Sequence, residues 1–180
     1  MVDTKDWTWV LERPCPECGF AAATLDRSDI GAATRSVAEQ FVGLLAGDER
    51  VKKRPDPAVW SALEYGCHVR DVFAIMGGRL NLILAEHDPP FANWDQDATA
   101  VAERYHDQDP SLVSADLLAN GLALADAFDA VRDDQWLRRG FRSDGSVFTV
   151  ESLGRYMVHD PVHHVWDVEQ GLAVLKGASG

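Results

Sequence analysis

With 180 residues and a net charge of −12, the chain is long enough for one domain with a sizeable core and too acidic to favour a phosphate backbone as a partner. No apolar run approaches the roughly 18 residues that span a membrane, and residues 1–6 lack the basic start and apolar core of a signal peptide. Three cysteines are too few for an extracellular disulfide framework and fit a reducing compartment. We therefore expect a cytoplasmic protein that binds neither nucleic acid nor membranes.

The first 28 residues are expected to form an irregular N-terminal extension, because prolines and a glycine interrupt any helix there. The extension contains the run Cys15-Pro16-Glu17-Cys18-Gly19, which looks like one zinc knuckle. A closed structural zinc site needs four ligands, and the sequence has no second CxxC pair. Three interpretations stay open: a redox or metal-binding dithiol, a pair that completes a site with a histidine or a partner subunit, or a tight turn with two inert thiols.

After the extension, apolar residues recur at helical spacing in four long stretches. The expected elements, in chain order, are a helix over 29–46, a helix over 56–86 with Pro57 in its first turn, a short helix over 98–105 within a polar connector, a helix over 111–131, a small hairpin or loop around 143–146, and a helix over 149–171. Phe91 and Trp94 of the connector are candidates for a pocket mouth. Residues 173–180 are expected to be a flexible tail.

The last predicted helix carries three of the six histidines within six consecutive residues: His159, His163 and His164. Residues i and i+4 lie about 40° apart on a helix, so His159 and His163 can bind one ion. Pro161 lacks an N–H, and a one-residue π-bulge around it would bring His159 and His164 together instead. Asp160 and His164 have the same i,i+4 spacing and are a third option.

A fourth histidine, His68, lies in the second predicted helix. We expect this helix and the last one to pack together, so that His68, His159 and one of His163 and His164 hold one metal ion. Three neutral imidazoles leave a divalent ion with an open coordination position. A thiolate in that position would close it, so we expect the two cysteines of the extension not to bind this ion.

These motifs resemble those of the DinB/YfiT-like superfamily. The stretch 60–68 is similar to the family's W-S-x-x-E-x-x-x-H segment, and the stretch 159–164 is similar to its H-D-x-H-H segment, whose first and last histidines bind metal. This chain has one extra residue in the second motif. The resemblance covers about residues 29–172 and implies an all-α, DinB-like four-helix bundle with long connections, preceded by the irregular extension.

The resemblance also implies chemistry, since members of this superfamily bind zinc or nickel through three histidines. Several resemble thiol S-transferases that use mycothiol or bacillithiol, or the N-terminal domain of a mycothiol-dependent maleylpyruvate isomerase. We therefore expect an enzyme, a metal-dependent thiol S-transferase that joins a low-molecular-weight thiol to an electrophilic small molecule, and a homodimer. The alternatives are a metal-dependent hydrolase and a non-catalytic, metal-stabilised stress or binding protein. Asp71 and Asp167, each three residues after a histidine, are candidates to orient the imidazoles.

Overall fold

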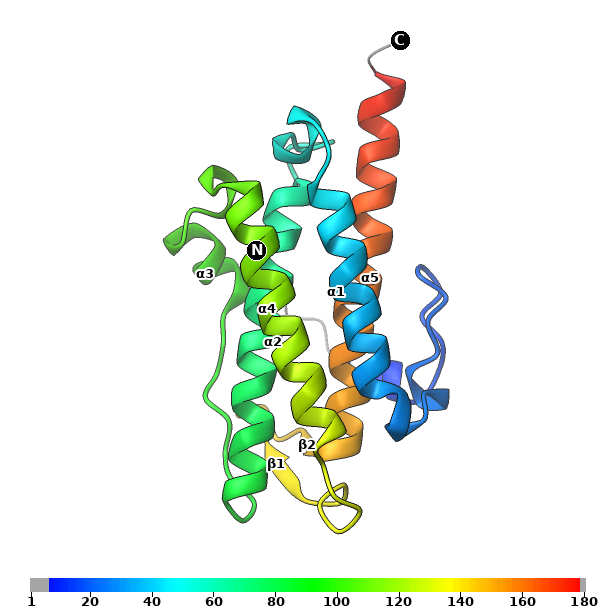
Figure 1. Cartoon of the computed structure of the whole chain (residues 1–180), viewed down its shortest axis with the longest axis vertical. Coiled ribbons are helices and arrows are strands. Elements are labelled where there is room, and N and C mark those ends of the chain that lie inside the picture. The colour runs from blue at the N-terminus through cyan, green and yellow to red at the C-terminus, as the bar shows by residue number, and fades with distance from the viewer. Residues whose placement is uncertain (1–6, 179–180) are drawn as a thin grey trace.

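Four long helices run side by side and make up most of the molecule (Figure 1). They are α1 (Ile30–Leu45), α2 (Ala62–Ala85), α4 (Pro110–Asp129) and α5 (Val150–Gly177). The computed structural model describes residues 7–178. Two sequence predictions fall on residues outside the described part. They are the expected absence of a signal peptide, at residues 1–6, and the end of the expected tail, at residues 179–180. The predicted all-α four-helix bundle with long connections is confirmed.

The order of the helices around the bundle brings α2 and α5 together. Both α1 and α2 pack against α4 and against α5. In Figure 1, α1 and α5 run toward the C-terminal end of the molecule, whereas α2 and α4 run the opposite way. The consecutive long helices α2 and α4 therefore point the same way. The long connector between them contains the short helix α3 (Gln96–Ala102) and returns along the outside of the bundle.

A capping box fixes the start of α2. The Ser61 hydroxyl accepts a hydrogen bond from the Glu64 backbone N–H, and the Glu64 carboxylate accepts one from the Ser61 N–H. The helix therefore begins at Ala62, and the prediction that Pro57 lies in its first turn was wrong. Thr149 and Ser152 cap α5 in the same manner, as its predicted start requires.

The helix α5 continues to Gly177, past the predicted end at 171. Gly171 does not end the helix and instead lies at a close packing contact. A Cβ atom built on it would lie 3.1 Å from Cγ of Pro55. The glycine thus allows the loop before α2 to pack closely on α5. Most of the segment that was expected to be a flexible tail is therefore helical.

A short hairpin closes one end of the bundle. Strands β1 (Arg139–Phe141) and β2 (Val147–Thr149) pair antiparallel, with Gly140 opposite Phe148. Phe91 packs against Gly140, where a Cβ would meet its ring at 2.4 Å, so this connector residue lies in the core and not at a pocket mouth. Of the two forms considered for this region, the structure has the hairpin.

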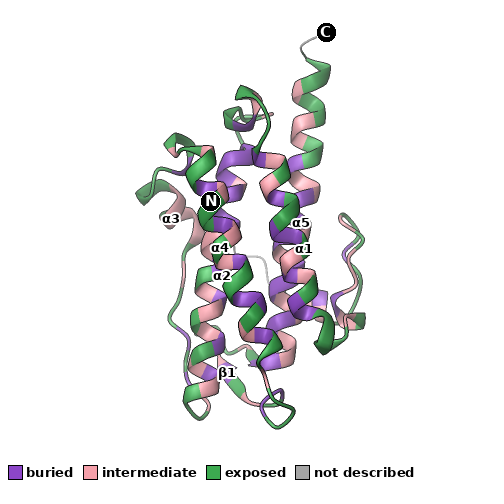
Figure 2. Cartoon of the chain, in the orientation of Figure 1, coloured by how far each residue is buried: buried purple, intermediate pink, exposed green. Residues whose placement is uncertain are grey.

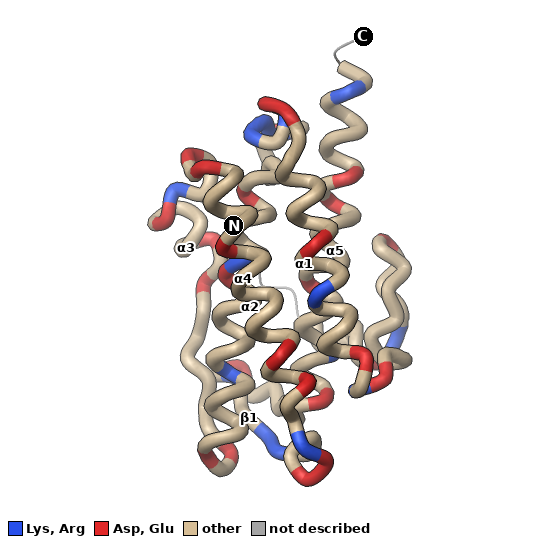
Figure 3. The backbone as a smooth tube through the Cα atoms, in the orientation of Figure 1, with Lys and Arg blue, Asp and Glu red and all other residues tan. Residues whose placement is uncertain are grey.

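The buried faces of the long helices turn toward one another (Figure 2), and acidic residues are spread over helices and loops (Figure 3). Among the described residues, one helix, α4, is long and apolar enough to cross a membrane by length and composition, which inspection of the sequence had not suggested. It buries Leu117, Leu124 and Phe128 in the bundle core. The core helix of a soluble protein passes the same test, so this is weak support for a span.

Candidate metal centres

The histidine-rich turn of α5 is regular α-helix. Every residue from Val150 to Gly177 is α-helical, Pro161 included, so the π-bulge considered from the sequence is not formed. The turn therefore carries two i,i+4 pairs, His159 with His163 and Asp160 with His164. Neighbouring residues on a helix differ by about 100°, so the two pairs face different sides of α5.

One pair meets α2 and forms the His68–Asp160–His164 cluster. A ligand atom from each of the three side chains lies within 4.8 Å of the others. Nε2 of His68 is 3.3 Å from Oδ1 of Asp160, and Nε2 of His164 is 3.7 Å from the same oxygen. Both ring nitrogens of His68 and Oδ1 of Asp160 are buried with no hydrogen-bond partner within residues 7–178. Buried polar atoms without hydrogen bonds are destabilising, so this donor set fits a bound cation.

Aromatic rings hold the imidazoles of this cluster in place. His68 stacks on Trp94, with ring centroids 5.5 Å apart and planes 6° from parallel, and the Trp60 ring lies 5.6 Å from the His68 ring. Tyr65 lies 4.9 Å from the His164 ring. Trp94, which was predicted to line a pocket mouth, does line the cleft, and its ring restricts the rotation of His68.

The two acids proposed to orient histidines behave differently. Oδ2 of Asp167 lies 2.8 Å from Nδ1 of His164, which leaves Nε2 of that ring toward Asp160. Asp71 instead accepts hydrogen bonds from Tyr105 and from Arg70, at 2.5 Å and 2.7 Å. Asp167 is therefore placed to fix the His164 tautomer, and Asp71 is engaged elsewhere.

The electrostatics of the cluster favour an ionised carboxylate. Burial disfavours the charged form of Asp160, but attraction to His68 and His164 outweighs it and holds the pKa of this carboxyl well below its usual range. A carboxylate is the form that binds a metal ion.

The other pair on α5 meets the N-terminal extension and forms the Cys15–Cys18–His159–His163 cluster. Four ligand atoms, one from each side chain, lie within 4.8 Å of one another. Burial, with the neighbouring His163, lowers the pKa of His159 to about 4, so that its imidazole is neutral at physiological pH. Burial raises the pKa of the Cys18 thiol to about 11.

Both clusters border one cleft of about 380 Å³. Asp160 and His164 line it from one cluster, and His159 and His163 line it from the other. Trp7, Trp94, Arg79 and Arg142 complete much of the wall. The sequence had not indicated Trp7 or the two arginines, because nothing in their local pattern relates them to the histidines.

The grouping of ligands differs from the expected one. The sequence placed His68 with His159 and one of His163 and His164, whereas the structure places His68 with Asp160 and His164. The Asp160/His164 option had been noted from its spacing, and Asp160 lies beside His68, where a second imidazole had been expected. The third cysteine, Cys67, is buried in the core, and burial raises the pKa of its thiol to about 12.

A helical bundle with a buried histidine and carboxylate cluster between two neighbouring helices defines a class of metal-binding bundle proteins. The family model described as the DinB superfamily matches residues 31–168, so the chain belongs to this superfamily. The matched region contains all three residues of the His68–Asp160–His164 cluster, and both extension cysteines lie before it.

Among solved structures, the chain is similar to YfiT from Bacillus subtilis, described as a probable metal-dependent hydrolase with an unusual four-helix bundle topology. The TM-score is 0.75 at 19% sequence identity, over 83% of this chain and 87% of that one. At this identity the likeness shows the fold. Comparison with curated proteins gives no match. The histidine, aspartate and cysteine groupings suggest a divalent metal in the chain.

Proposed function

We propose that the chain is a metal-dependent enzyme in which the His68–Asp160–His164 cluster holds one divalent ion, zinc or nickel, and promotes attack of a low-molecular-weight thiol on an electrophilic small molecule. The observation that carries this proposal is the grouping of His68, Asp160 and His164 beside the cleft, with both ring nitrogens of His68 and Oδ1 of Asp160 buried and without a hydrogen bond. Mycothiol is the thiol that the family resemblance favours. A cytoplasmic homodimer remains a prediction from the sequence.

A thiol needs less activation by a metal ion than water does, which supports a thiol as the nucleophile. His68, Asp160 and His164 would hold a divalent ion through two imidazoles and one carboxylate, and the bound ion would act as a Lewis acid that lowers the pKa of a thiol or water beside it. A free thiol has a pKa of about 8.5, against about 15.7 for water, so the thiol needs a far smaller shift. It also has less need of a general base to remove its proton.

Among the described residues of the cleft, the carboxylates are committed to other contacts. Asp160 belongs to the cluster, and Asp167 lies against His164. Asp95 caps α3 by accepting a hydrogen bond from the Ala98 N–H. None is free to activate a water molecule in this arrangement, which supports the thiol.

Two arginines indicate that one reactant is an anion. Arg79 and Arg142 line the cleft. Arg142 pairs with Asp144, while Arg79 makes no ion pair with a carboxylate among the described residues and contacts the Ala92 carbonyl at 3.4 Å. Burial, with repulsion from Arg142, lowers the pKa of Arg79, because two like charges share a partly desolvated space. A carboxylate on the electrophile or on the thiol would relieve this repulsion.

Hydrolysis is the second candidate. Two histidines with one carboxylate are also the ligand set of some zinc hydrolases, and YfiT, which shares the fold, is described as a probable metal-dependent hydrolase. The non-catalytic, metal-stabilised protein is the third outcome that an assay must distinguish.

The test incubates the metal-loaded chain with acidic and neutral electrophiles and a panel of thiols that includes mycothiol, bacillithiol and glutathione. Metal-dependent conjugation that is lost in Asp160→Asn and kept in the control Cys67→Ala would support transfer. Ester or amide cleavage without thiol would support the hydrolase. A full metal site with no turnover of any panel member would refute both enzymatic proposals.

A further inference from the structure

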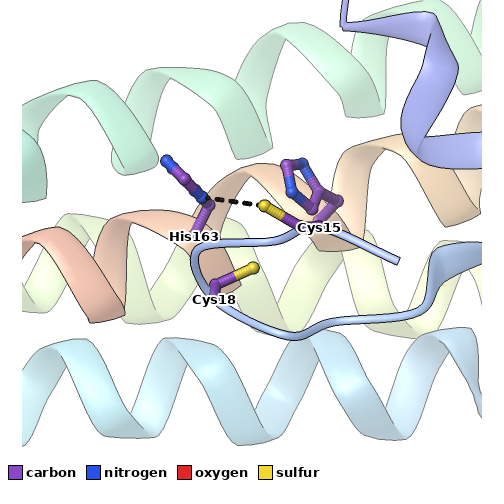
Figure 4. Close-up of side chains that lie close together, drawn as sticks. Cys15, Cys18 and His163 are labelled. Carbon is purple, nitrogen blue, oxygen red and sulfur yellow. Dashed lines mark hydrogen bonds between the residues drawn. The ribbon is translucent and has the colours of Figure 1, made fainter. Parts of the chain in front are cut away.

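The N-terminal extension reaches α5 through a tight turn that contains both of its cysteines. The Cys15 N–H donates to the Phe20 carbonyl and the Gly19 N–H donates to the Cys15 carbonyl, both at 2.9 Å. Gly19 has φ of +74°, a conformation that glycine adopts without strain. Figure 4 shows the turn lying over α5, with the Cys15 sulfur in contact with His163 and Cys18 beside it.

The spacing of the four side chains matches a tetrahedral zinc site. Sγ of Cys15 is 3.6 Å from Nδ1 of His163. A tetrahedron with Zn–S of about 2.3 Å and Zn–N of about 2.0 Å places sulfur and nitrogen about 3.5 Å apart. The remaining ligand atoms of the cluster lie within 4.8 Å of one another, so small rotations suffice to close the tetrahedron.

Burial and hydrogen bonding point to an ion at this place. Cys15, His159 and His163 are 1%, 4% and 8% exposed. Nε2 of His159 is buried with no hydrogen-bond partner in the described part of the chain. Nε2 of His163 lies 3.5 Å from the carboxylate of Glu17, a residue of the same turn. A carboxylate on one ring nitrogen is the usual way to orient a histidine that binds metal through the other nitrogen.

We propose that Cys15, Cys18, His159 and His163 form a second metal site, a closed structural zinc site that fastens the N-terminal extension to α5. Two thiolates and two imidazoles are a donor set of structural zinc, and four protein ligands leave no open position. The histidine-rich turn of α5 then serves two ions, one through His159 and His163 and one through Asp160 and His164.

The site also shapes the cleft. Trp7 lies 5.9 Å from the His159 ring and 5.4 Å from the His163 ring, and it lines the cleft. An ion that fixes the extension on these two histidines therefore fixes one wall of the cleft. A redox dithiol would explain the two cysteines alone, but it gives no reason for the unpaired nitrogen of His159 beside them.

Metal counting on the purified full chain tests the proposal. We expect two ions per wild-type chain, one in the double variant Cys15→Ser with Cys18→Ser, one in His68→Ala, and two in the control Cys67→Ala, whose thiol lies in the core. After cobalt substitution, the wild type and His68→Ala should show thiolate-to-cobalt charge transfer, and the double cysteine variant should not.

The wild-type cobalt spectrum needs no variant, so the test holds even if the double variant fails to fold, which circular dichroism would reveal. Absence of the thiolate band from the cobalt-saturated wild type would overturn the proposal, as would an unchanged ion count in a folded double variant or a Cys15–Cys18 disulfide in the freshly purified chain. One ion per wild-type chain, with the thiolate band, would support this site and count against the His68–Asp160–His164 cluster.

Discussion

Replacement of Asp167 should weaken metal binding at the His68–Asp160–His164 cluster. Its Oδ2 atom lies 2.8 Å from Nδ1 of His164, the nitrogen that points away from Asp160. Loss of this contact frees the imidazole to rotate and to take the other tautomer. Asp71 offers a matched control, because it has the same spacing from His68 in sequence but is hydrogen-bonded to Tyr105 and Arg70.

The size of the effect follows from the kind of contact. Removing the carboxylate that orients a metal-binding histidine typically weakens metal binding by about 10–100-fold, which is about 1.4–2.7 kcal/mol, and this is the loss expected for Asp167→Ala. Asp167→Asn keeps an acceptor oxygen but loses the charge. Since charge-assisted hydrogen bonds are about twice as strong as neutral ones, half of that free energy, or a loss of about 3–10-fold, is expected.

Competition with a chromophoric chelator measures these affinities. The measurements use the Cys15→Ser, Cys18→Ser background, so that only one candidate site remains. Asp71→Asn should bind metal as tightly as its parent. Equal affinities for Asp167→Ala and the parent, or a larger loss in Asp71→Asn than in Asp167→Ala, would refute the assigned role of Asp167.

Three further predictions concern stability and substrate binding. Glu64→Gln should destabilise the fold by about 1–2 kcal/mol at neutral pH in urea unfolding, because it weakens the α2 cap and the pairing with Arg54. Burial opposes ionisation of Glu64, but Arg54 and Ser61 hold its pKa below the usual value. The stability that the carboxylate contributes is therefore lost as pH falls through that pKa, and the difference in unfolding free energy between the two proteins should disappear in acid. Gly121→Ala should cost about 1–3 kcal/mol by overpacking, because its Cβ would lie 2.8 Å from Cβ of Ala38, whereas the exposed Gly43→Ala should stabilise α1 by about 0.5–1 kcal/mol; equal melting temperatures for the two would contradict this. Arg79→Ala should raise KM for an acidic substrate about 10-fold or more while a neutral analogue is unaffected, and an equal change for both substrates would remove Arg79 from anion recognition.

The fold could be predicted from the sequence because local patterns determine most of it. Apolar spacing located the four helices, and Thr149 marked the start of α5. The start of α2 was placed too early, because Pro57 and Ser61 both suit a helix N-terminus and only the reciprocal contact with Glu64 decides between them. Gly171 was taken as the end of α5, because its close contact with Pro55 is not visible in the sequence.

The grouping of the candidate metal ligands could not be predicted in the same way. The pairs His159/His163 and Asp160/His164 have identical spacing, so helix geometry alone cannot rank them. The choice depends on which segment lies against each side of α5: α2 brings His68 to one pair, and the extension brings Cys15 and Cys18 to the other. These are contacts between segments far apart in the chain, and the cysteines lie outside the region that the family model matches.

We infer that two sides of the histidine-rich turn of α5 hold two separate metal ions. Anomalous X-ray scattering at the zinc edge, from crystals of the zinc-loaded chain, tests it most directly. We expect two peaks, one among His68, Asp160 and His164 and the other among Cys15, Cys18, His159 and His163. A single peak bound by His68 and His159 together, the pairing that the sequence alone favoured, would contradict it.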